Sequence, residues 1–74
     1  MAKLSAQGLE IGRVEIDDTL YAIFENRWIL RKFRYDEGRR WSAWTRYNRV
    51  RKGAELTDFW KRFVAARQTA AKQS

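Results

Sequence analysis

The apolar residues of this 74-residue chain change their spacing once along the sequence, and this change constrains the fold more than any other feature. Between residues 9 and 47, apolar and polar side chains alternate, which is typical of half-buried β-strands. From residue 56 the apolar residues recur every three to four positions, as on one face of an amphipathic helix. The pattern predicts a single α+β domain, in which a small antiparallel β-meander of three to four strands is followed by one C-terminal amphipathic helix packed on the sheet.

Turn-forming residues divide the alternating part of the chain into strands. Asp17 and Asp18 favour a first turn, and Asn26 tolerates the left-handed conformation that a second turn needs. Gly38 takes a positive φ without steric cost in a third turn, and Gly12 marks a bulge inside the first strand. The predicted strands span residues 9–16, 19–24, 28–35 and 40–47, and a basic link over 48–53 leads to the helix.

An apolar stripe with helical spacing follows the basic link, and no proline interrupts it. We expect one domain over residues 9–72, with a flexible N-terminus over residues 1–8 and a frayed C-terminus over residues 73–74. In this prediction the stripe packs on one face of the sheet. It consists of Leu56, Phe59, Trp60, Phe63 and Val64.

The composition excludes several kinds of functional site. The chain has no Cys and no His, which removes disulfides, thiolate metal sites and the commonest general base. The neighbouring carboxylates lie in predicted turns, where they do not converge on one substrate, and no Gly-rich phosphate loop is present. We therefore expect a binding protein and not an enzyme, with no cofactor and no metal. The sequence has neither a membrane-spanning apolar run nor a secretory signal, so we expect a cytoplasmic protein without membrane contact.

Positive charge is concentrated in the middle of the chain. The chain has 16 basic and 9 acidic residues, a net charge of +7. Residues 27–52 hold ten of the basic residues and two of the acidic ones. Clustered charge of one sign predicts an acidic partner, because an ordinary solvated surface interleaves acids with bases. We expect this partner to be nucleic acid, with DNA favoured over RNA.

Alternation assigns the side chains of the fourth predicted strand to two faces. Trp41, Ala43, Thr45 and Tyr47 are predicted to face the core, and the residues between them face outward. On the outward face, basic side chains would bind phosphates, and Trp44 would stack on an exposed base or wedge between base steps. A slip of one residue in either strand would exchange the two faces. The candidate nucleic-acid-binding residues are Arg31, Lys32, Arg34, Arg39, Arg40, Trp44, Arg46, Arg49, Arg51 and Lys52.

Other interpretations of the basic, aromatic segment remain open. Arg and Trp are also enriched at protein hot spots, so the same face could dock on an acidic surface of a host enzyme or polymerase. The acidic first strand could pair with the basic hairpin of a second copy, which would give a homodimer. For any single residue, packing of an aromatic ring or an arginine stem over apolar surface is the simpler role.

The predicted order of strands followed by a C-terminal helix resembles several small binding folds. Among them are the integrase arm-binding and plant AP2-type domains, which read DNA with a three-stranded sheet, and the SH3-like and chromo-like modules. The resemblance lies in the fold and implies no site residues. A phage or mobile-element origin would suit a basic chain of this size.

Overall fold

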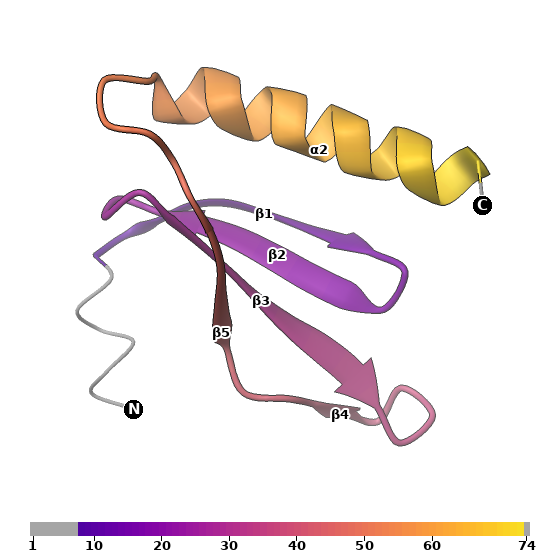
Figure 1. Ribbon diagram of the computed structural model, residues 1–74. Coiled ribbons are helices and arrows are strands. Elements are labelled where there is room, and N and C mark those ends of the chain that lie inside the picture. Colours follow the sequence, from indigo (N-terminus) through magenta and orange to yellow (C-terminus); the bar gives the residue numbers. More distant parts are fainter. Residues whose placement is uncertain (1–7, 74) are drawn as a thin grey trace.

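The computed structural model describes residues 8–73 and shows an antiparallel sheet with one helix packed on it (Figure 1). The strands follow one another in the order β1-β2-β3-β4, and β5 also pairs with β3. The predicted class, an α+β meander before a C-terminal helix, is confirmed. The predictions for residues 1–7 and 74 lie outside the described residues. The elements are β1 (Glu10–Ile16), β2 (Thr19–Phe24), β3 (Trp28–Tyr35), β4 (Arg40–Trp41), β5 (Thr45–Arg49) and α2 (Leu56–Gln73).

The turns fall where the sequence predicts them, with one difference in detail. Asp17 and Asp18 both have positive φ, 52° and 60°, as in a tight two-residue hairpin turn. In the second turn Arg27 takes the left-handed conformation, with φ of 74°, so the assignment of that conformation to Asn26 is wrong. Asn26 stabilises the same turn through its side chain, because its Oδ1 accepts a hydrogen bond of 3.1 Å from the backbone N–H of Trp28.

One face of the sheet packs against α2, which lies over β1 and β2 in Figure 1. Four of the five residues of the predicted apolar stripe form this contact, as half-buried helix residues cover the buried side chains of the sheet; the fifth, Val64, is not part of it. The aromatic rings interlock: Trp60 stacks on Phe63 at 5.4 Å, and Phe63 meets Tyr21 edge to face at 5.3 Å. The buried residues of this core are Tyr21, Ile23, Ile29 and Val50, and the helix residues on them are Leu56, Phe59, Trp60 and Phe63.

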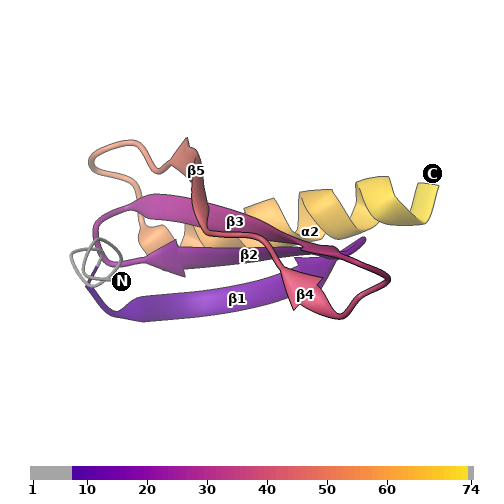
Figure 2. The ribbon, with the colours of Figure 1, turned by 90° about the horizontal axis from the view of Figure 1, so that it is seen from below.

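The fourth predicted strand is not continuous. It is divided into β4 and β5 by three residues without strand structure, and Figure 2 shows this part of the chain running along β3. The break begins at Ser42. Its N–H donates to the carbonyl of Phe33 at 2.7 Å, as in a regular ladder. The N–H of Phe33 then donates to Ser42 Oγ at 2.8 Å, where a regular ladder would use the backbone carbonyl.

The break moves Trp41 to the other face of the sheet. Thr45 lies opposite Arg31, so a regular ladder would place Trp41 opposite Tyr35, but Trp41 lies opposite Arg34. The chain therefore contains one extra residue between the two pairings, which is a bulge. The predicted core position of Trp41 is wrong for this reason, because a slip of one residue exchanges the faces.

Candidate nucleic-acid interface

Three of the four tryptophans lie on the sheet face away from α2, which we call the tryptophan face. Trp28 belongs to β3, Trp41 to β4, and Trp44 to the segment between β4 and β5. Trp60 belongs to α2 and packs against the core on the other side of the sheet. Residues from separate elements thus place their indoles on one surface.

The tryptophan face covers a small apolar core of its own. Leu20, Ala22 and Leu30 are 7%, 0% and 1% exposed, although alternation directs them away from α2. The half-buried aromatic side chains of this face shield them from water. Trp44 meets Phe24 edge to face, with ring centroids 6.3 Å apart. The indoles therefore stabilise the sheet and also form the floor of its outer surface.

Four of the predicted cations lie over these indole rings, and three of them, Lys32, Arg46 and Arg49, form no ion pair in the described chain. Lys32 Nζ is 4.8 Å from the ring centroid of Trp44 and 5.2 Å from that of Trp41. The guanidinium carbons of Arg46 and Arg49 are 5.0 and 5.6 Å from the Trp28 ring centroid. Within residues 8–73, none of the three cations has a carboxylate within 4.0 Å. The tryptophan face thus combines ordered positive charge with aromatic surface.

Arg34 lies on the same face, but its charge is balanced within the chain. Its Nη2 is 3.0 Å from Glu15 Oε1, and its Nε is 3.9 Å from Asp18 Oδ1. Its Nη1 donates to the carbonyl of Gly38 at 3.1 Å, and the guanidinium covers the Trp41 ring at 4.1 Å. Arg34 therefore joins β1 to the β3–β4 hairpin and has less charge to offer a ligand than Lys32.

The two predicted cations at the hairpin tip also have acidic partners. Arg39 Nη2 is 3.3 Å from Glu37 Oε1, and Arg40 Nε is 3.6 Å from Asp36 Oδ2. These side chains are exposed, so their ion pairs are weak and exchange readily with other anions. Arg40 lies opposite Tyr35, which alternation places on the face of α2. The structure therefore separates Arg40 from the tryptophan face.

Arg31 also belongs to the face of α2, because it pairs with Tyr21 of the core. Its guanidinium carbon lies 4.5 Å from the Tyr47 ring centroid and 5.1 Å from that of Phe33. Its Nε is buried and has no hydrogen-bond partner in the described chain. Arg31 thus packs over aromatic rings on the side opposite Lys32, and the structure does not bring it together with Arg46 and Arg49.

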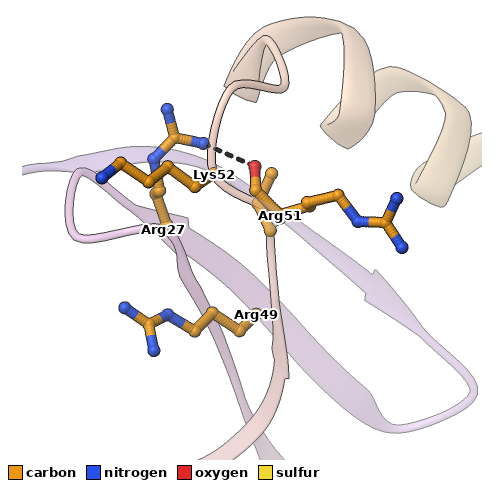
Figure 3. Close-up of a pocket in the computed structure, with 5 residues that line it drawn as sticks. Arg27, Arg49, Arg51 and Lys52 are labelled. Carbon is orange, nitrogen blue, oxygen red and sulfur yellow. Dashed lines mark hydrogen bonds between the residues drawn. The ribbon is translucent and has the colours of Figure 1, made fainter.

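The last two predicted cations, Arg51 and Lys52, line a pocket of about 700 Å³ beside the end of the tryptophan face. We call this pocket the link pocket. Its lining consists of Arg27, Arg49, Val50, Arg51 and Lys52, without any acidic residue. In Figure 3 Arg49 and Lys52 extend toward the side on which Arg27 lies, whereas Arg51 extends the other way. Sequence reasoning missed Arg27 because its role depends on the turn before β3, although it lies within the basic segment.

Glu10 is a further acidic group close to the tryptophan face, besides the partners of Arg34. Glu10 Oε1 is 2.6 Å from Arg13 Nη2, and Glu10 Oε2 accepts a second bond of 2.7 Å from Arg13 Nε. This hydrogen bonding lowers the pKa of Glu10 below its ordinary value of 4.5, against the opposing effect of burial, and the charges of Arg13 and Lys32 lower it further. Glu10 therefore stays ionised at neutral pH and neutralises Arg13 at the rim of the face.

Two further observations on the described residues concern metal binding and membrane spanning. No group of three acidic side chains in residues 8–73 is placed to hold a metal ion. In the same part of the chain, no helix is both long and apolar enough to span a membrane. Comparison of the sequence and fold with protein-family models, curated proteins and solved structures finds no match.

Proposed function

We propose that this chain is a small nucleic-acid-binding protein, with DNA favoured, and that it acts by binding and not by catalysis. One observation carries the proposal: Lys32, Arg46 and Arg49 are held over indole rings on one face and have no carboxylate within 4.0 Å in the described residues. An anionic strand laid across this face would meet three cations that form no ion pair within residues 8–73. Neutralising phosphates in this way releases counterions, which drives association.

The indole rings hold these cations in place before a ligand binds. Ordering a free Lys or Arg side chain costs roughly 1.5–2 kcal/mol of conformational entropy. A cation–π contact contributes about 0.5–1 kcal/mol at an exposed site, so it offsets part of that cost before the ligand arrives. Because the cations cover the ring faces, we expect Trp28 and Trp44 to position charge and not to serve as open platforms for bases. Contacts made mainly to phosphates imply weak dependence on base sequence.

The shape of the sheet supports DNA as the favoured partner. The β3–β4 hairpin extends beyond the part of the sheet that α2 covers (Figure 1). A two-stranded ribbon of this kind fits the major groove of B-DNA. Arg39 and Arg40 lie at or beside its tip, where their weak ion pairs can be exchanged for phosphate contacts.

A pair of equally charged variants tests this function. We expect Arg46→Gln to weaken binding to a duplex oligonucleotide and to reduce the slope of log K against log salt by about 0.9, the value for one phosphate contact. Arg62→Gln is the control, because Arg62 is exposed on α2 and also has no carboxylate within 4.0 Å in residues 8–73. Fluorescence anisotropy at several salt concentrations measures both slopes.

Two outcomes would contradict the proposal. Failure of the unaltered protein to bind duplex or single-stranded oligonucleotides at low salt would remove nucleic acid as the partner. Equal loss of slope in Arg46→Gln and Arg62→Gln would show that only net charge matters and that the tryptophan face has no special role.

A second candidate is docking on an acidic surface of another protein, such as an enzyme or polymerase. The exposed aromatic residues of β3 favour it: Phe33 is 42% and Tyr35 50% exposed, on the side of β3 that carries Arg31. Aromatic and arginine side chains together are typical of protein hot spots. We expect Phe33→Ala to leave oligonucleotide affinity unchanged under the first proposal, whereas it would weaken the complex under the second. Affinity measured for the same variant with the oligonucleotide and with a captured acidic protein separates them.

A further inference from the structure

We infer that the link pocket is a phosphate-binding site that holds the backbone of the nucleic acid where the strand leaves the tryptophan face. The inference rests on the proposed function and adds a defined place of contact. Its central residue is Arg27, whose side chain lies among those of the basic link.

One nitrogen of the Arg27 guanidinium is held by hydrogen bonds to the backbone, and the other two can donate to a ligand. Its Nη1 donates to the carbonyls of Arg51 at 2.9 Å and Ala54 at 3.1 Å (Figure 3 shows the first bond). Its Nε and Nη2 donate to no other group within the described residues. A guanidinium held at one corner keeps two donors in a fixed plane, which is the geometry that binds a phosphate in bidentate fashion.

Backbone hydrogen bonds connect the segment around Arg27 to the link, so the pocket is formed in the protein without a ligand. Val50 is 1% exposed, and its N–H donates to the carbonyl of Arg27 at 2.8 Å. The N–H of Ala54 donates to the carbonyl of Arg51 at 3.1 Å, which closes the turn of the link. Preorganised donors of this kind cost little conformational entropy on binding.

The charges in the pocket favour an anionic ligand. Arg27, Arg49 and Lys52 gather on one side of the link, and no acidic residue lines the pocket. Like charges in one pocket repel each other in the free protein, and a phosphate relieves this repulsion when it binds. A volume of about 700 Å³ is large enough to admit a phosphate group.

The link pocket adjoins the tryptophan face, so one strand of nucleic acid can contact both surfaces. Arg49 belongs to both, because it lines the pocket and its guanidinium carbon lies 5.6 Å from the Trp28 ring centroid. A strand lying over Lys32 and Arg46 would reach Arg49 next and then the pocket. The inference therefore assigns Arg27 and Lys52 to backbone phosphates beyond the indoles.

Two adjacent residues of equal charge supply a matched test. We expect Lys52→Gln, whose side chain extends toward the pocket, to reduce the salt slope of duplex binding by about 0.9. Arg51→Gln removes one charge from the same link, but its side chain extends away from Arg27, so we expect a clearly smaller change. In parallel, inorganic pyrophosphate is added to each protein, and the amide NMR signals of residues 49–54 are followed. We expect them to shift in Arg51→Gln as in the unaltered protein, and to shift several-fold less in Lys52→Gln.

The outcomes separate this inference from the function on which it rests. Unaltered slope in Lys52→Gln, or equal loss in both variants, would overturn the pocket assignment and leave nucleic-acid binding through the tryptophan face standing. Pyrophosphate binding at the link without any oligonucleotide binding would overturn both the backbone assignment and the proposed function, and would identify free phosphate compounds as the ligand. Loss of slope in Lys52→Gln alone supports the inference.

Discussion

At residue 12 the backbone of β1 lies against the edge of the Trp60 indole. A Cβ atom at Gly12 would be 2.8 Å from Trp60 Nε1 and 3.3 Å from Trp60 Cδ1. The helix can approach this closely only because the side chain at residue 12 is a hydrogen atom. The sequence predicted a bulge near Gly12, and the register shift between Glu10 and Gly12 confirms it. The contact with Trp60 could not be predicted, because it depends on how α2 lies over the sheet.

Gly12→Ala tests this close approach. We expect it to lower the free energy of unfolding by about 1–3 kcal/mol, the usual cost of overpacking a core, as measured by chemical denaturation. Trp60→Phe removes the indole edge that the new methyl group would meet, so the cost of Gly12→Ala should be smaller in that background. An equal cost in both backgrounds would show that the contact with Trp60 is not the cause.

At the scale of elements, alternation correctly assigned Tyr47 to the face of α2 but failed for Trp41. Strand periodicity predicts facing only while pairing stays in register, and it places residues three apart, such as Trp41 and Trp44, on opposite faces. The bulge after Ser42 returns both indoles to one face. No property of Ser42 in the sequence marks it as the residue that leaves the ladder, because serine also occurs inside regular strands.

Deletion of Ala43 tests the assignment of one extra residue to this segment. With Ala43 removed, the pairings Arg31–Thr45 and Arg34–Trp41 become consistent with one continuous strand, and both indoles keep their face. We expect a protein that still unfolds cooperatively and in which the amides of Trp44 and Thr45 gain protection from hydrogen exchange.

Deletion of Ala22 is the control for this prediction. Ala22 is fully buried and paired on both sides within β2, so its removal would shift two ladders and unfold the protein. If the protein without Ala43 is as unstable as the protein without Ala22, the fold requires the irregular segment between β4 and β5. The extra residue would then not be a dispensable insertion into a continuous strand.

At the scale of the whole molecule, the sequence located the basic segment but could not show which charges it leaves unbalanced. The acids that neutralise Arg34 come from β1 and the turn after it, Glu15 and Asp18, and only the folded sheet brings them together. In the same way, the sheet separates Arg31 from Lys32, which is its neighbour in the chain. Composition therefore predicts the charge of the segment, and the topology decides which part of it faces a ligand.

The tryptophans report directly on the central claim, which is that the face away from α2 binds nucleic acid. Each indole N–H gives one NMR signal. Three of the four tryptophans lie on the tryptophan face, whereas Trp60 belongs to α2 and packs against the core on the opposite side of the sheet. When a duplex oligonucleotide is added at low salt, we expect the signals of Trp28, Trp41 and Trp44 to shift together and that of Trp60 to stay in place. A shift of Trp60 with the other three unchanged would contradict the account.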